Sequence, residues 1–444
     1  MEIDRVTARL ARPTSPAALA AFRIFFGLLM AFAAIRFWLK GWIESLYIEP
    51  QFHFKYAWFP WVDVLPSFWL HGVFILMVIS ALLIAAGAYT RTAAAVFFTA
   101  FVYTELIDKT TYLNHYYLVS LVAFLLIWLP SDRLWALKPA HPSKTSIPAG
   151  AYTVLRWQFG LVYFFAGVAK LNADWLLRGE PLGTWLKGFS HLPFLGSILA
   201  NDSIAIVMSW GGAVFDLTIW MWLLSGRLRW LAVMMAVGFH LTVGVLFPIG
   251  IFPWVMLLGV SLFLPPEWPR QFLSRWTQKS VTPMDTSQRH TVSRLWLIAA
   301  VIWVTAQVAI PLRHLGYEGP VNWTEQGFRF SWRVMLIEKT GTLDYRIETE
   351  QPRASYRVNP RDSLTPLQFK MLVTQPDMIA DYARHLDETF RAKGYGDVRV
   401  FADSFVSFNG RLSQRYVDHT IDLSEETEQH GHIVVPLEVI KWSE

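Results

Sequence analysis

Nine apolar runs separated by polar segments occupy the first 312 residues and constrain the fold of this chain more than any other feature. They lie at about 16–37, 67–89, 92–107, 114–130, 151–172, 204–225, 229–247, 249–264 and 294–312. A helix needs about 20 apolar residues to cross a bilayer, and helices satisfy their own backbone polar groups in lipid. The runs therefore predict a mainly α, polytopic bundle of about nine spans, several of them shorter than a straight crossing requires.

Charge supports a membrane protein and predicts its orientation. Only 16% of the residues are charged and 54% are hydrophobic, which is a low charge content for a soluble protein of this length. With a cytoplasmic N-terminus, the inner loops hold fourteen Lys and Arg residues and the outer loops six. The positive-inside rule then places the C-terminal region outside the cytoplasm. The net charge of +5 is spread over loops, so we expect the bilayer and no nucleic acid as a partner.

Signals for export and for metal binding are weak. The first apolar run is too long for the apolar part of a signal peptide and is followed by no small-residue cleavage site, so we expect an anchoring span. Cysteine is absent, which excludes disulfides and thiolate metal sites. His430 and His432 are too sparse a pair for a metal, and we predict none.

After about residue 316 the composition becomes that of a water-soluble domain. We predict a membrane bundle at 1–315 and a small extracytoplasmic α+β domain at 316–444 that binds substrate. Period-two alternation, turn residues and helix signals predict the elements of this second domain. They are a strand at 328–336, a turn at 339–342, a strand at 343–347, a helix that starts near Pro376 and stops at Gly394, a strand at 398–408 and a hairpin turn at Asn409-Gly410.

Polar side chains inside the spans are the candidates for function, because each is costly in lipid and should face the bundle interior or water. They are Arg23, Glu105, Asn114, His115, Arg156, Lys170, Asp216 and His240. By the predicted orientation, Lys109, His115 and Lys170 all fall in the outer half of the bundle. One cavity near the outer face would bring these three together.

Lys170, near the outer end of the fifth span, allows two interpretations. A lysine at a span end often extends toward the headgroups, and Asp174, one helical turn later, would then pair with it. Alternatively, Lys170 is a base held inside the bundle. Taken alone, His115 is more typical of a polar residue at a helix start, and His240 of a hydrogen-bonded interior histidine.

Six ordered motifs carry a resemblance to a known family. They are DKTTYLNHYYL (108–118), LRWQFGLVYFFAGVAKLNADW (155–175), GGAVFDL (211–217), FH (239–240), IGIFPWVML (249–257) and PEWPR (266–270). Each resembles, in the same order, a segment of the vitamin K-dependent gamma-glutamyl carboxylases. GYEGPVNWTEQGFRFSWRVM (316–335) and VSFNGR (406–411) are similar to the region that follows in the family.

The resemblance implies a multi-span bundle with a lumenal domain and a specific reaction. In that family a reduced vitamin K hydroquinone reacts with O2 to give a strong base, which removes a proton from the γ-carbon of a protein glutamate before CO2 adds there. Lys170 matches the family's catalytic lysine, and His115 with Asn114 matches its Asn-His pair, which contacts the quinone. His240 matches a histidine of a comparable span, and we add Arg23 and Arg156 as candidate cofactor-binding cations.

A lysine is chemically suited to the first step of that reaction. A phenol-like hydroxyl ionises near pH 10 in water, as tyrosine does, so its deprotonation at neutral pH needs a free amine. Burial lowers the pKa of lysines by up to about 3–5 units. A dry pocket also suits a prenylated quinone, either a reduced menaquinone or phylloquinone, and keeps water from the reactive base.

The chain also departs from the family. Ala169-Lys170 stands where the family has two lysines, Tyr112-Leu113 stands where it has Trp-Asn, and Glu444 ends the chain much earlier than in the animal enzymes. Two alternatives therefore stay open beside a glutamate carboxylase acting on a protein or peptide. One is a quinone epoxidase without carboxylation. The other is a membrane transporter or lipid-binding protein, in which Lys170 and His115 would be exchangeable.

Overall fold

Each of the nine apolar runs contains a helix in the computed structural model, which describes residues 2–141, 145–277, 288, 290–425 and 430–438. The nine are α2 (Ala17–Leu39), α3 (Ser67–Ala86), α4 (Thr90–Ile107), α5 (Asn114–Trp128), α6 (Gly150–Ala169), α10 (Asp202–Leu224), α11 (Arg229–Leu246), α12 (Phe252–Ser261) and α14 (Arg294–Leu312). Five of them, α2, α3, α10, α11 and α14, are long and apolar enough to cross a membrane. The mainly helical class is confirmed, whereas the count of nine crossings stays a prediction.

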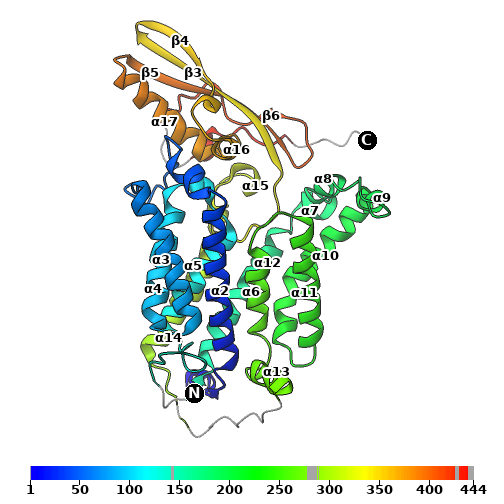
Figure 1. Ribbon diagram of the computed structural model, residues 1–444. Helices are drawn as coiled ribbons and strands as arrows, with labels where there is room; N and C mark the ends of the chain where they lie inside the picture. The colour runs from blue at the N-terminus through cyan, green and yellow to red at the C-terminus, as the bar shows by residue number, and fades with distance from the viewer. Residues whose placement is uncertain (1, 142–144, 278–287, 289, 426–429, 439–444) are drawn as a thin grey trace.

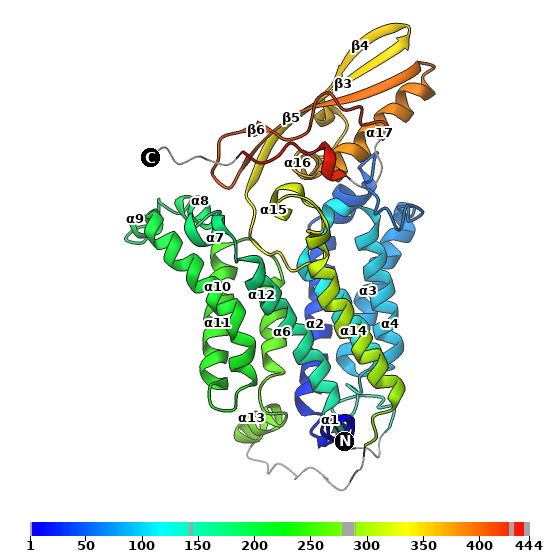
Figure 2. The same ribbon diagram turned by 180° about the vertical axis from the view of Figure 1, so that it is seen from behind.

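The helices form two groups (Figure 1). Helices α2 to α5 pack in sequence on one side, and α6 packs with α10, α11 and α12 on the other. Helix α12 contacts both α2 and α6 and so joins the groups, while α14 crosses the back of the bundle against α6 (Figure 2). Phe22 of α2 meets Phe159 of α6 edge to face at the centre, with ring centroids 6.1 Å apart.

The two ends of the bundle differ. Helix α1 (Glu2–Leu10) and α13 (Trp268–Thr277) lie at the end that holds the N-terminus. The short helices α7 (Ala173–Leu177), α8 (Leu182–Lys187) and α9 (Gly196–Leu199) lie at the opposite end, beneath the sheet domain (Figure 1). Three of the fourteen inner charges, Lys144, Lys279 and Arg289, and the C-terminal Glu444 lie outside the described residues.

A four-stranded antiparallel sheet forms the second domain. Its strands are β3 (Lys339–Gln351), β4 (Arg353–Val358), β5 (Gly396–Phe408) and β6 (Gln414–Arg415), in the order β4-β3-β5-β6. Helices α15 (Val321–Thr324), α16 (Pro366–Leu372) and α17 (Pro376–Ala392) lie between or against them. Alternate residues of β3, such as Tyr345, are buried in one core with Tyr382 of α17. The predicted helix, the 398–408 strand and the hairpin after it are confirmed.

Two predictions for this domain are wrong. Residues 328–336 form an irregular loop rather than a strand, and Phe330, Trp332 and Met335 have positive φ angles of 62°, 58° and 56°. Trp332 is buried and stacks on Tyr117 of α5 at 4.9 Å, so the apolar alternation reflects docking of this loop onto the bundle. The predicted turn at 339–342 is the first part of β3, paired with residues 405–408 of β5.

Ion pairs join the sheet domain to the outer ends of the bundle helices. Asp174 of α7 accepts hydrogen bonds from Arg411 at 2.5 and 2.8 Å and from Asn409 Nδ2 at 3.1 Å, so the VSFNGR turn is seated on the bundle. Lys109, which follows α4, pairs with Asp377 of α17 at 2.8 Å. The domain is thereby tied both to the α2–α5 group, through Lys109, and to α7, through Asp174.

We expect Asp174→Ala to weaken the docking of the 409–411 turn on the bundle. A lost charged hydrogen bond costs about 1.5–3 kcal/mol, so amide exchange in residues 409–415 should rise about ten- to hundredfold in hydrogen-exchange mass spectrometry. Asp202→Ala, which removes only an exposed pair with Lys187, is the matched control. Equal exchange in both variants would contradict the docking role.

The same pairing predicts a pH dependence. Burial by itself would raise the pKa of Asp174, but Arg411, Asn409 and Arg178 together lower that pKa below its ordinary value. A carboxyl with a lowered folded-state pKa contributes stability above its unfolded pKa of about 3.9 and loses it as the pH falls through the folded-state pKa. In the wild type, the protection of residues 409–415, measured against the intrinsic exchange rate at each pH, should therefore fall below about pH 4.

Candidate active site

Lys170 lies at the C-terminal end of α6, inside the bundle. Its Nζ is 2.8 Å from Asp216 Oδ2 of α10, donates to the Ala166 carbonyl oxygen at 3.3 Å, and lies 5.2 Å from the centroid of the Trp175 ring. Only 6% of Lys170 and 4% of Asp216 is exposed. The alternative of a snorkelling lysine paired with Asp174 is therefore wrong, because Asp174 pairs with Arg411 instead.

Close packing of α6 on α10 makes this ion pair possible. Gly167, one turn before Lys170, faces Leu217 so closely that an added Cβ would lie 2.7 Å from the Leu217 backbone nitrogen. Any larger side chain at Gly167 would separate the two helices. The glycine therefore brings Lys170 of one span against Asp216 of another.

Lys170 and Asp216 form part of the wall of an apolar cavity of about 390 Å³, which we call the Lys170 cavity. Phe215 and Phe239 stack in its wall with ring centroids 4.2 Å apart. His240 Nε2 is 2.6 Å from the Tyr163 hydroxyl, while its Nδ1 is buried without a hydrogen-bond partner among the described residues. The cavity thus combines apolar walls with one ion pair and one free imidazole nitrogen, as small-molecule sites do.

His115 lies in a second cavity of about 380 Å³, the His115 cavity. It sits in the first turn of α5 and is 8% exposed, and no described residue hydrogen-bonds either ring nitrogen. Asn114 has a different task. Its Nδ2 donates to the Arg333 carbonyl oxygen at 3.1 Å and its Oδ1 accepts from the Tyr112 hydroxyl at 3.0 Å. Asn114 therefore fixes the 328–336 loop beside His115.

The two cavities are neighbours. Phe252, Val334 and Met335 line both of them. The Phe252 ring stands between the histidines, with its centroid 6.0 Å from that of His115 and 6.1 Å from that of His240. The expected single cavity is thus two chambers that share one wall.

Arg23 and Arg156 are not brought to these chambers. Arg23 donates to the Ile84 carbonyl at 3.0 Å and the Trp135 carbonyl at 2.6 Å, and so joins α2 to the loop after α5. Arg156 donates to the Leu262 carbonyl at 2.8 Å and lines a separate apolar groove between α6 and α10. Both guanidinium groups satisfy backbone carbonyls at helix ends.

A third cavity, of about 620 Å³, lies between the bundle and the sheet domain. We call it the interdomain cleft. Its wall carries several charged residues, namely Lys109, Glu325, Arg329, Glu338, Lys339 and Lys370. Met335 lines this cleft and both chambers, so the three spaces meet at one side chain.

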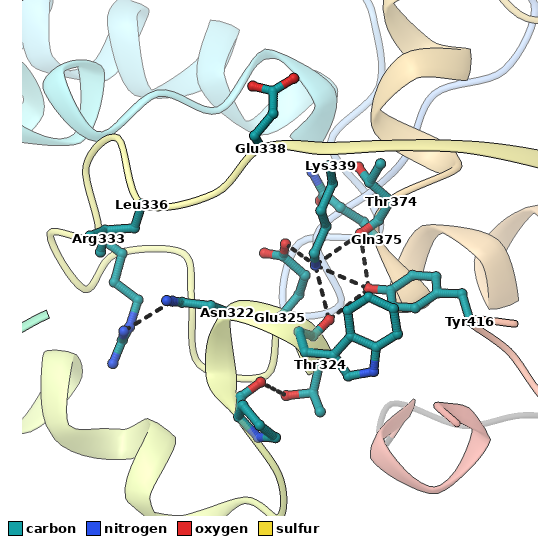
Figure 3. A network of polar contacts seen from close by, with 12 residues as sticks. Asn322, Thr324, Glu325, Arg333, Leu336, Glu338, Lys339, Thr374, Gln375 and Tyr416 are labelled. Carbon is teal, nitrogen blue, oxygen red and sulfur yellow. Dashed lines mark hydrogen bonds and ion pairs between the residues drawn. The ribbon is translucent and has the colours of Figure 1, made fainter. Parts of the chain in front are cut away.

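Most charges of the cleft are already paired, as Figure 3 shows for Lys339. Lys339 Nζ lies 2.7 Å from Glu325 Oε1 and 2.9 Å from the Trp323 carbonyl oxygen. Burial lowers the pKa of Lys339 and raises that of Glu325, and their mutual attraction opposes both shifts. This network holds the first residue of β3, Lys339, in place, and both of its charged groups are neutralised by each other.

The comparisons agree with this architecture. The HTTM domain family matches residues 11–268, and the lumenal domain of vitamin K-dependent gamma-carboxylase matches residues 292–438. The chain belongs to the vitamin K-dependent gamma-glutamyl carboxylase family. As in that family, it is an integral membrane protein with an extracytoplasmic domain. No solved structure gives a significant match.

Sequence reasoning missed two features of this carboxylase-family site. Asp216 was noted as a charge in an apolar span, which is a signal of function, but its partner Lys170 lies 46 residues away. The position of Phe252 and Met335 between the chambers could not be predicted, because aromatic residues are common in spans and methionines are common in loops. Helix packing and loop docking place them between the chambers.

Proposed function

We propose that this family member couples oxygenation of a reduced vitamin K hydroquinone to carboxylation of glutamate in a peptide. The observation that carries the proposal is a buried lysine, ion-paired to Asp216, at the wall of an apolar cavity in the bundle. A buried amine that exchanges a proton with a nearby carboxylate is suited to general base catalysis. Reaction of the hydroquinone with O2 supplies the strong base for the glutamate γ-proton, and CO2 is the second substrate.

The residues present fit a quinone. The Lys170 cavity falls within the range of about 300–1,000 Å³ expected for ligand sites and has stacked phenylalanines in its wall. His240 and its hydrogen-bond partner Tyr163 line the cavity as neutral polar groups beside the ion pair. The step requires Lys170 as the free amine, with its earlier proton released from the site, and Asp216 as the carboxylate; Nζ then accepts the hydroxyl proton, and Asp216 stabilises the ammonium that results.

His115 completes the site from the neighbouring chamber. Neutral imidazole both donates and accepts hydrogen bonds, and the His115 ring nitrogens are free to do either. We place the peptide in the interdomain cleft, whose wall continues into the His115 cavity through Leu113 and Asn114. The fourteen-to-six charge bias orients these openings away from the cytoplasm, with the N-terminus inside.

A labelling experiment tests the function. Purified full-length protein is given reduced vitamin K, O2, carbonate labelled with ¹⁴C and a short glutamate-containing peptide. We expect label in the peptide together with epoxide, and neither product without the hydroquinone. The same peptide with glutamine in place of glutamate is the control. Epoxide without labelled peptide would identify a quinone epoxidase, and the absence of both products would refute the proposal.

A further inference from the structure

Two cations of the His115 cavity have no role in the function proposed above. Arg36, in the last turn of α2, is half-buried with its guanidinium 5.0 Å from the Trp42 ring centroid. Arg333, in the 328–336 loop, is 8% exposed and donates to Asn322 Oδ1 at 3.2 Å, while its Nε has no hydrogen-bond partner among the residues that the structure describes. Figure 3 shows Arg333 apart from the Lys339 network.

No carboxylate in the described part of the chain pairs with either arginine. By contrast, three of the four cations that line the interdomain cleft, Lys109, Arg329 and Lys339, are bridged to acids, and the fourth, Lys370, is exposed to solvent. Glu325 attracts Arg333 from a distance but is bridged to Lys339. Glu105 lines a separate small cavity beside Tyr116 and forms no ion pair with a described residue. The wall of the His115 cavity thus holds two guanidinium groups and no acid.

Such a cavity is incomplete without an anion. A buried charge is costly unless it is paired and hydrogen-bonded, and a guanidinium presents several N–H donors in a planar fork that matches a carboxylate. The two arginines reach the cavity from different domains, Arg36 from the bundle and Arg333 from the docked loop. Seating of the sheet domain therefore assembles the pair.

We propose that the His115 cavity binds the side-chain carboxylate of the substrate glutamate, with Arg333 and Arg36 as its anion-binding residues. The inference rests on the proposed carboxylase function and names where its substrate is held. The cavity shares Leu113, Asn114, Pro248, Ile249 and Met335 with the interdomain cleft. A glutamate side chain of a peptide in the cleft therefore enters past these residues.

This position places the reacting carbon where the chemistry needs it. The γ-carbon is bonded directly to the carboxylate, so a carboxylate held by Arg333 brings that carbon beside His115. The same cavity shares Phe252, Val334 and Met335 with the Lys170 cavity. Guanidinium charge next to the carboxylate also stabilises the negative charge that develops when the γ-proton leaves.

Binding selectivity tests the site without turnover. Full-length protein in nanodiscs is titrated with a glutamate-containing peptide and with its glutamine counterpart. We expect the wild type to prefer glutamate, and Arg333→Gln or Arg36→Gln to raise the Kd and KM of the glutamate peptide about ten- to hundredfold. The Kd of the glutamine peptide should change little. Arg333→Lys, which keeps a cation, should retain part of the preference.

Controls and outcomes separate this proposal from the function itself. Arg353→Gln, at the exposed start of β4, removes the same charge far from the cavity and should keep the wild-type preference. Arg36→Gln changes a half-buried side chain and keeps the test valid if Arg333→Gln fails to fold. Unchanged selectivity in both variants, or a raised KM for CO2 alone, would overturn the carboxylate site. Selective peptide binding without labelled product would refute only the proposed function.

Discussion

Lys170→Ala should abolish both epoxide formation and peptide carboxylation, because deprotonation of the hydroquinone precedes both. Removing a general base costs about 10²- to 10⁴-fold in rate, and no second amine among the described residues lies at the cavity wall to replace it. Epoxide and carboxylated peptide should therefore fall together. Both are measured on purified protein, the first by chromatography and the second by incorporated label.

Lys170→Arg is the matched control for folding. An arginine keeps the positive charge beside Asp216, yet its guanidinium stays protonated at any working pH and cannot act as a base. Lys170→Arg should therefore insert and fold like the wild type and still be inactive. A small exogenous amine should partly restore Lys170→Ala, because a free base in the vacated space performs the same proton transfer.

The same amine should fail to restore His115→Ala. We assign His115 a directed hydrogen bond from a fixed position in its own cavity, and a diffusing base has no such geometry. Near-wild-type epoxidation in Lys170→Ala, or equal rescue of both variants, would exclude Lys170 as the base.

The helices and the candidate base, Lys170, could be predicted from the sequence because their signals are local. Apolar runs of helix length give helices whatever their neighbours, and Lys170 carries its own motif within one span. The 339–351 strand was only half anticipated, since its first residues resemble a turn until they pair with β5. The pairing of two strands that are distant in sequence leaves no signal in the residues of either strand.

The geometry of the site depends on long-range packing and escaped prediction. Residues 328–336 alternate like a strand, but Trp332 is buried and stacks on Tyr117 of the bundle instead of lying in a sheet. That docking places Met335 between the chambers and Arg333 in one of them. Asp174 is the acid nearest to Lys170 in the sequence, yet it pairs with Arg411 of the VSFNGR turn. Its place beside Lys170 is taken by Asp216.

Asp216→Asn should lower the rate of epoxidation about 100-fold while leaving the KM for hydroquinone within a few fold. The asparagine keeps the shape of the side chain but removes the anion that stabilises the ammonium formed when Lys170 accepts a proton. Leaving a buried charge without its partner costs about 3–5 kcal/mol. Only part of this free energy raises the barrier of the proton transfer, which is why the expected loss of rate is smaller than the full cost. A positioning role of this kind lowers kcat more than it changes binding.

A double-mutant cycle distinguishes this role from a structural one. Residues that act as a unit are strongly non-additive, so Asp216→Asn should cost little further activity in the Lys170→Ala background. Amine rescue should disappear in that double variant, since the rescuing ammonium needs the same carboxylate 2.8 Å from the position of Nζ. Additive losses, or rescue that persists without Asp216, would show that the aspartate only supports the packing of α10 on α6, and that Lys170 works without an anionic partner.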